Sequence, residues 1–308
     1  MPPIVTAEEV LKAFANIRMA PASGGRAVHK PLLILFWLGR LERGEPRMAA
    51  FADVEGQFKQ LLAEFGSANS PNTRHYPFWY LGNDDEGRIW QLESAGGIAL
   101  STQGAVPGLT WFRERGVLAG FAPAVDGRLR ADKLLRAALA RQLLAQNFPE
   151  TLHSDIATQT GLDIDQPAMG GAALSGRRRD PAFRERVLRA YEYRCCVCGF
   201  DLRIGNVSAG LEAAHIQWFT ADGPDVETNG MAMCALHHKI FDLGAFTVEP
   251  VNLSIVFSQN LQLGDATRAH LLSYHGAGII GPQSTAYAPD QHFLDWHAKE
   301  VFKAPGRD

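Results

Sequence analysis

Four segments of the first half of the chain have helical patterns, and in the first and last of them apolar residues recur every three to four positions, the spacing of one helical face. The first segment opens with Thr6 and Glu9, a capping-box pair. The second segment, which begins at Lys30 and Pro31, is apolar almost all round, so we expect it to be the buried centre of a domain. The four predicted helices cover residues 6–17, 30–41, 51–65 and 132–144.

The pattern of apolar positions changes in other parts of the chain. Residues 78–92 have the pattern of two strands joined by a turn, and a short alternating strand ends at His215. From about residue 160 the pattern dissolves, until Asp180 and Pro181 restart a helix. We therefore predict an α+β protein, with a mainly helical domain and a small hairpin over residues 1–159, a linker over residues 160–176, and a second domain over residues 177–308.

Composition and charge limit the possible functions only loosely. The chain has 308 residues, of which 46% are hydrophobic and 20% charged, and its net charge is −3. These values are ordinary for a globular protein, and the acidic balance argues mildly against a general nucleic-acid binder. Residues 177–194 nevertheless carry seven Arg against three acidic residues. Such a run is either a solvated helix face or a surface that tracks phosphates.

The sequence carries no sign of export or of membrane insertion. The N-terminus lacks a basic region followed by an apolar stretch, and the most apolar run, residues 32–38, is too short to cross a bilayer. We therefore expect a cytoplasmic protein with no membrane partner. In such a protein, four cysteines indicate a metal site rather than a disulfide framework.

Two pairs of metal-ligating residues share the same spacing. Cys195 and Cys198 are separated by two residues, and so are Cys234 and His237. Two such pairs can close a tetrahedral site for a structural Zn²⁺ ion. The alternative is that the thiols are simply buried, as free cysteines often are. Cys196 falls outside the spacing, and we expect no metal role for it.

Further histidines lie between and beside these pairs. On a helix, Cys234 and His237 can face zinc while His238 and Asp242, four residues apart, face another site. One short helix could then serve two metal ions. Taken singly, each histidine is more often a hydrogen-bonded surface or core residue, so the interpretation depends on the combination.

This part of the chain resembles the HNH endonuclease family. The matching stretches are CVCG (196–199), AAHI (213–216), NG (229–230) and MCALHHKIFD (233–242), within about residues 180–250. The resemblance implies a zinc-stapled ββα-metal finger in which His215 is the general base that activates water. It implies that Asn229 holds the loop that orients His215, and that His238 binds a catalytic divalent ion such as Mg²⁺ or Mn²⁺.

One position departs from the pattern of the HNH family. Many members place Asp or His directly before the catalytic histidine as a second metal ligand, whereas this chain has Ala214. Asp242 is the predicted replacement. Glu212 is a weaker candidate, because strict strand alternation places it on the opposite face from His215.

The first half of the chain resembles the sulfur-recognition domain of restriction endonucleases that bind phosphorothioated DNA. The matching stretches are RAVHKPLLILFWLGRL (26–41), FG (65–66), HYPFWYLGND (75–84) and GRIWQL (87–92), with FLDWHAKEVF (293–302) near the C-terminus. The resemblance implies a partner in double-stranded, phosphorothioate-modified DNA. Sulfur is larger and less hydrated than oxygen, so a reader needs a small apolar cup and flanking cations.

Six residues are the predicted reader residues of this domain. Tyr76 and Pro77 could form part of the cup, with cationic or base-edge contacts from Arg26, His29 and Lys30. Tyr80 is bulky, and if the family needs a small residue there, the domain reads another mark or seats its ligand differently. The structural alternative is that Pro31 only starts a helix, with Phe78 and Trp79 in the core.

Together these features predict a modification-dependent restriction endonuclease. One HNH site cuts one strand, so double-strand cleavage requires a homodimer or two binding events. Two alternatives remain open, an HNH nuclease that reads another modification or a plain sequence, and a catalytically dead, zinc-stapled DNA-binding module.

Overall fold

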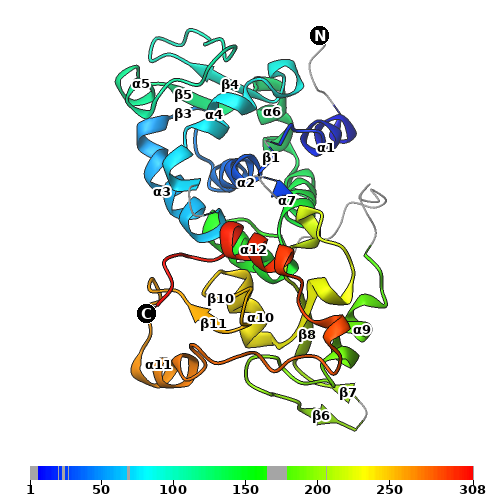
Figure 1. The fold of residues 1–308 in the computed structure, drawn as a ribbon. Coiled ribbons are helices and arrows are strands. Elements are labelled where there is room, and N and C mark those ends of the chain that lie inside the picture. The colour runs from blue at the N-terminus through cyan, green and yellow to red at the C-terminus, as the bar shows by residue number, and fades with distance from the viewer. Residues whose placement is uncertain are drawn as a thin grey trace. The chain divides into compact units, whose positions relative to one another are not determined.

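The computed structural model describes residues 6–19, 21–22, 25–26, 28–67, 70–164, 179–205 and 207–307. The chain divides into two compact units, unit 1 (Met1–Ser175) and unit 2 (Gly176–Asp308) (Figure 1). Helices alternate with small sheets in both units, so the predicted α+β class is confirmed. The predicted linker lies largely outside the described residues, as do Arg177 and Arg178. Within the described ranges, no helix is long and apolar enough to cross a membrane.

Unit 1 is built around helix α2 (His29–Glu42), in which every residue from 31 to 41 is buried. This is the almost wholly apolar segment of the sequence, and α3, α4, α7 and α8 all pack against it. The other helices are α1 (Ala7–Ala15), α3 (Phe51–Phe65), α4 (Tyr76–Leu81), α5 (Leu109–Glu114), α6 (Pro123–Ala131), α7 (Lys133–Asn147) and α8 (His153–Thr160). Thr6 and Glu9 form the predicted capping box of α1.

Unit 1 also contains two small sheets. Strands β3 (Ala49–Ala50), β5 (Leu118–Phe121) and β4 (Trp90–Glu93) form an antiparallel sheet in that order, and β1 (Pro21–Ala22) pairs with β2 (Gly25–Arg26). The middle strand, β5, therefore comes from a part of the chain for which the apolar pattern predicts neither helix nor strand.

The hairpin predicted over residues 78–92 is wrong. Its first half is helix α4, and its second half, β4, pairs with β5 instead. Pro77 stands in the first turn of α4, where its missing N–H costs nothing. Phe78, Trp79 and Leu81 are all buried, so this short segment is apolar on several sides, and such a run has no periodicity that separates helix from strand.

Unit 2 contains a strand–strand–helix finger formed by β8 (Leu211–His215), β9 (Gly230–Cys234) and α10 (Ala235–Asp242). Helix α9 (Phe183–Ala190) packs on both strands, and its first residue comes three residues after the predicted cap Asp180. The remaining elements are β6 (Arg203–Ile204), β7 (Val207–Ser208), β10 (Phe246–Val248), β11 (Ile255–Phe257), α11 (Asp265–Leu272) and α12 (Gln291–Glu300).

Helix α12 closes the core of unit 2 through the buried His297. The His297 ring stacks on Phe241 of α10 with 3.7 Å between ring centroids. Its Nε2 lies 3.1 Å from the Phe241 carbonyl oxygen, and its Nδ1 lies 3.0 Å from the Thr247 hydroxyl. Burial lowers the pKa of His297 to about 4, so the ring is neutral and serves as a packing element.

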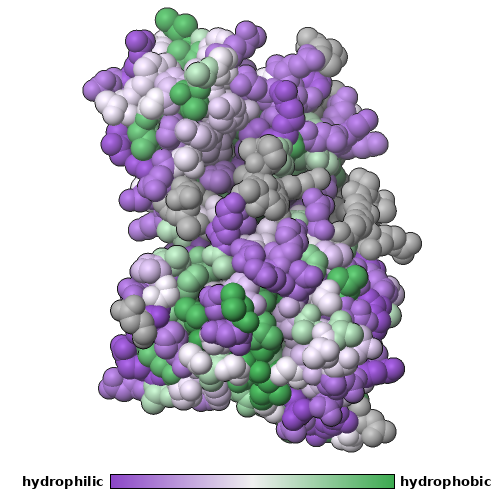
Figure 2. Space-filling view, in the orientation of Figure 1, coloured by the Kyte–Doolittle hydropathy of each residue, from purple (hydrophilic) through white to green (hydrophobic). Residues whose placement is uncertain are grey.

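The visible face of unit 2 carries hydrophobic residues below α12, over the region of β10, β11 and α10 (Figure 2). Large apolar side chains are also exposed around the β6–β7 hairpin, among them Leu202, Ile204 and Val207. Single exposed apolar residues are ordinary on protein surfaces.

A matched pair of glycines tests the packing of α2. A Cβ atom on Gly39 of α2 would lie 1.7 Å from the carbonyl oxygen of Thr160, whereas one on Gly56 of α3 would meet nothing within 4 Å. We expect Gly39→Ala to lower the free energy of unfolding of unit 1 by about 3 kcal/mol, because α2 and α8 must separate. We expect Gly56→Ala to raise it by about 0.5–1 kcal/mol. Denaturant unfolding of both variants checks this, and equal effects would contradict the close approach.

Candidate functional site

His215 lies at the end of strand β8, packed between α9 and the loop that precedes β9. Its ring stacks on Phe183 with 4.1 Å between centroids, and its Nε2 lies 2.8 Å from Oδ1 of Asp225. Burial lowers the pKa of His215, and the Asp225 carboxylate opposes that effect. The histidine is therefore held in one orientation by a ring on one side and a carboxylate at its edge.

Asn229 is fully buried, and its side chain binds backbone groups at both ends of the loop 217–224, which follows His215. Its Oδ1 accepts a hydrogen bond from the Gln217 amide at 2.8 Å, and its Nδ2 donates to the carbonyl oxygens of Gln217 (3.0 Å) and Pro224 (2.9 Å). All these backbone groups are satisfied by one side chain. Asn229 thus joins the segment after His215 to the segment before Asp225.

His238 lies between two carboxylates. Its Nδ1 is 2.6 Å from Glu212 Oε2, and its Nε2 is 3.2 Å from Asp242 Oδ2. Burial disfavours the protonated ring, but Asp242 and Glu212 outweigh burial and raise the pKa of His238 to about 9. The same contact with His238 lowers the pKa of Glu212. The three side chains form a compact group that favours positive charge.

Asp242 connects the parts of this site. It is almost fully buried, and its Oδ1 accepts a hydrogen bond from the Trp218 indole at 3.1 Å. Its charge helps to raise the pKa of His238 and weakly opposes the lowering of the pKa of His215, so its field acts on both histidines. Ala214, the residue that departs from the HNH pattern, is buried in the core of unit 2.

The cysteines of the two spaced pairs converge with a histidine from α10. One potential ligand atom from each of Cys195, Cys198, Cys234 and His237 lies within 4.8 Å of all the others. His237 Nδ1 lies 3.1 Å from the Cys234 sulfur and 3.6 Å from the Cys195 sulfur. The Cys234 thiol stabilises the Cys195 thiolate and so lowers the pKa of Cys195. A converging Cys₃His set of this kind fits a tetrahedral zinc ion.

The chain geometry around these ligands explains how adjacent residues serve different purposes. Gly199 has a φ of +74°, in the left-handed region, which lets the chain turn back after Cys198. Cys196 is not a member of the converging set and is buried in the core of unit 2, and burial raises the pKa of its thiol. On α10, His237 faces the cysteines while its neighbour His238 faces Glu212 and Asp242.

In unit 1, the predicted reader residue Lys30 is already paired. Its ammonium lies 2.5 Å from Asp84 Oδ2 and donates to the Arg18 carbonyl oxygen at 2.8 Å. Burial lowers the pKa of Lys30, against the opposing effect of Asp84. The exposed cation beside this pair is Arg18, whose side chain is 74% exposed and which also contacts Asp84.

Of the other predicted reader residues, Tyr76 and Tyr80 are exposed. They lie one turn apart on α4, each 40% exposed, with their ring centroids 6.0 Å apart. Pro77 is buried beneath them, and His29 lies near the Thr73 hydroxyl at 3.4 Å. The backbone of Arg26 belongs to β2, but its side chain is outside the described part of the structure.

An ion cluster around the buried Glu55 and Arg74 positions the start of α4. Glu55 on α3 accepts hydrogen bonds from Arg74 at 2.9 Å and from Arg113 at 2.6 Å. Arg74 stands two residues before Tyr76, so the cluster fixes the helix that carries the two tyrosines. Removing Glu55 would leave the buried Arg74 cation without its carboxylate partner, which is costly.

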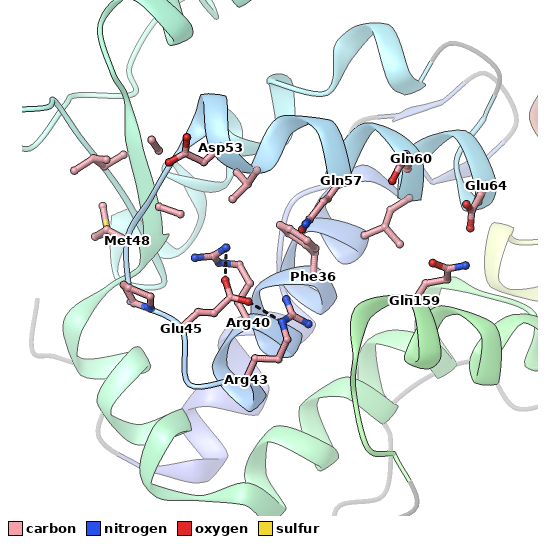
Figure 3. A pocket seen from close by; sticks show the side chains of 16 residues that line it. Phe36, Arg40, Arg43, Glu45, Met48, Asp53, Gln57, Gln60, Glu64 and Gln159 are labelled. Atoms are coloured by element: carbon pink, nitrogen blue, oxygen red, sulfur yellow. Dashed lines mark hydrogen bonds and ion pairs between the residues drawn. The ribbon is translucent and has the colours of Figure 1, made fainter.

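A cavity of about 630 Å³ opens elsewhere in unit 1, between α2, α3 and the β3 strand (Figure 3). Glu45 accepts from Arg40 and from Arg43, each at 2.6 Å, and Asp53 and Glu64 add negative charge to the walls. Because the guanidinium groups are already paired with a carboxylate, the cavity does not favour a phosphate. Of the described residues that line it, none is a predicted reader residue.

Three residues in these sites were not predicted, or were ranked low, from the sequence. Glu212 contacts His238, Asp225 contacts His215, and Arg18 contacts the Lys30–Asp84 pair. Asp225 and Arg18 carry no motif signal. Glu212 stands three residues before His215 in the AAHI strand, and only the position of α10 over that strand reveals its contact.

The comparisons with known proteins agree with the two units. Residues 7–165 match the family described as ScoMcrA-like, DNA sulfur-binding domain, and residues 195–249 match the HNH endonuclease family. No curated protein sequence matches the chain.

Solved structures that are similar include the sulfur binding domain of SprMcrA complexed with phosphorothioated DNA. It is 25% identical, with a TM-score of 0.45, over 53% of this chain and 97% of that one. The Type IV phosphorothioation-dependent restriction endonuclease ScoMcrA is 23% identical, with a TM-score of 0.42, over 56% of this chain and 33% of that one. The modification dependent TagI restriction endonuclease is 23% identical, with a TM-score of 0.29, over 46% of this chain and 41% of that one.

The TM-scores are too low to support an argument, so the assignment rests on the sequence families. The sulfur-binding family covers just over half of the chain, and the HNH family covers the finger that holds His215, Asn229 and His238. The protein therefore belongs to the ScoMcrA-like DNA sulfur-binding domain family, and carries an HNH endonuclease domain in its second unit.

Proposed function

We propose that this protein is a restriction endonuclease that binds phosphorothioated double-stranded DNA through unit 1 and hydrolyses it with a one-metal HNH site in unit 2. The observation that carries the proposal is the joint presence of a sulfur-binding domain and of an HNH finger with an oriented histidine, His215. A sulfur-binding domain alone would support only a binding protein.

His215 is the general base in this proposal. A water molecule gives a proton to His215 while its oxygen bonds to phosphorus, and the bond from phosphorus to the 3′ oxygen breaks. The 3′ oxygen takes up a proton from solvent, which leaves 3′-hydroxyl and 5′-phosphate ends. The stacking on Phe183 and the Asn229 clamp support this role, since a base must be held within reach of its proton.

His238 and Asp242 would hold the catalytic divalent ion, with Glu212 as a second carboxylate. The carboxylate pair already raises the pKa of the ring between them, which indicates that this position favours a cation. The two carboxylates suit Mg²⁺ or Mn²⁺, and the imidazole allows softer divalent ions as well. Such an ion, when bound, would offset charge on the scissile phosphate and on the departing oxygen.

Tyr76 and Tyr80 are the proposed apolar contacts for the sulfur, because they are exposed and adjacent. Arg18 joins Arg26 and His29 as a proposed phosphate or base contact, and Lys30 would act by holding Asp84. Two strands need two cuts, so the proposal includes a homodimer or two successive binding events.

The first prediction concerns cleavage and its dependence on the modification. With Mg²⁺ or Mn²⁺ added, we expect the protein to cut a phosphorothioated duplex and to leave an unmodified duplex of the same sequence intact. We expect His215→Ala to slow cleavage by about 100-fold or more without changing affinity, because the base is lost. Equal cutting of both duplexes would contradict the sulfur-reading part, and binding without cutting by the unaltered protein would favour a dead DNA-binding module.

The second prediction separates binding from chemistry. We expect Tyr76→Ala to weaken binding of the phosphorothioated duplex about tenfold, because one wall of the sulfur contact is lost, with little change in cleavage rate at saturating protein. Leu134→Ala is the control, since Leu134 is also an apolar residue of unit 1 and is 41% exposed. Fluorescence anisotropy measures both affinities, and equal affinities would exclude this role for Tyr76.

The third prediction concerns the structural metal. We expect the purified protein to hold about one zinc ion per chain, and Cys198→Ala to lose that ion and melt at a lower temperature. Cys196→Ala is the matched control and should keep its zinc. Elemental analysis of both variants measures their zinc content. Loss of zinc from both variants, or from neither, would refute the assignment of Cys198 as a ligand.

A further inference from the structure

We propose that Asp225 is a positioning residue for catalysis, which fixes the tautomer of His215 so that Nδ1 is the atom that accepts the proton from water. This inference deepens the proposed function and rests on it, since it concerns the same histidine. Among the motifs of the sequence, none includes Asp225.

The contact is direct and sheltered. His215 Nε2 lies 2.8 Å from Asp225 Oδ1, and the two side chains are 13% and 12% exposed. An ionised carboxylate only accepts hydrogen bonds, so Nε2 carries the hydrogen in the neutral ring. Nδ1 then keeps its lone pair. Among the described residues, no protein group binds Nδ1, which leaves this atom available to water.

Asp225 is itself held from its other side. Its Oδ2 accepts a hydrogen bond from the backbone amide of Asp180 at 2.7 Å, and its backbone carbonyl oxygen accepts one from Arg186 at 2.7 Å. The carboxylate therefore has one oxygen for an amide and one for the histidine. It cannot rotate away without breaking both contacts.

This arrangement makes the Asn variant informative. In Asp225→Asn, the amide of Asp180 still needs an acceptor, so the side-chain oxygen stays on that amide. The NH₂ group then faces Nε2 of His215, where two donors cannot meet. The ring is forced into the tautomer with hydrogen on Nδ1, and the base is lost although size and shape are nearly unchanged.

A structural role alone would not produce the same result, and a control variant shows the difference. Glu227 contacts the same Arg186 at 2.9 Å, but not His215. Glu227→Gln also removes one negative charge and keeps an acceptor for Arg186. We expect it to cleave like the unaltered protein, with the same affinity for DNA.

The experiment compares full-length Asp225→Asn, Glu227→Gln and His215→Ala with the unaltered protein. Single-turnover cleavage of a phosphorothioated duplex gives the rate, anisotropy gives the affinity, and thermal melting reports folding. Ring ¹⁵N shifts from ¹⁵N-histidine labelling give the tautomer, and the His215 signals are assigned by their loss in His215→Ala. We expect Asp225→Asn to slow cleavage by about 100-fold or more, with affinity and melting temperature kept and the hydrogen moved to Nδ1.

The remaining outcomes separate the two proposals. If His215→Ala fails to cut while Asp225→Asn cuts at the normal rate, the positioning role is overturned and the nuclease proposal stands. An Nε2–H tautomer that persists in Asp225→Asn overturns the positioning role whatever the rate. If His215→Ala cuts normally, the proposed base and the inference that depends on it are both overturned.

Discussion

In the β8–β9 ladder, Leu211 lies opposite Cys234 and His215 lies opposite Gly230, so one register sets both ends of the finger. One end presents Cys234, a member of the converging Cys₃His set, and the other presents His215, the proposed general base. A slip of one residue would turn every side chain of a strand to the other face. Gly230 supports this register, because a Cβ there would lie 2.5 Å from Val187 and push α9 from the strands.

Local signals in the sequence were sufficient for much of this architecture. The capping box at Thr6, the apolar segment of α2 and the helical pattern of residues 132–144 are all local, and each helix forms close to where the pattern places it. The two spaced pairs, which start at Cys195 and Cys234, also meet in space, because the Cys196 amide donates a hydrogen bond to the Ala232 carbonyl oxygen of β9.

Such local signals could not predict contacts between segments that are distant in the sequence. In the sequence, Asp225 is simply an acidic residue in a polar loop. Its contact with His215 depends on Asn229, which holds that loop in place through the Pro224 carbonyl oxygen. The alternation of side chains along the strand assigns Glu212 to one face but does not show which helix covers that face. In the structure, α10 brings His238 to Glu212. The prediction of a strand within residues 76–81 was wrong for another reason. A short segment that is buried on several sides has no hydrophobic period that would identify it as a helix.

The stacking of His297 on Phe241 has a consequence for how the chain is made. Chains emerge from the ribosome N-terminus first, so α10 is synthesised about fifty residues before α12 reaches it. Until then, the helix that bears His237 and His238 lacks its buried aromatic partner. A nascent chain would thus complete its DNA sulfur-binding domain well before the core of its HNH domain could close.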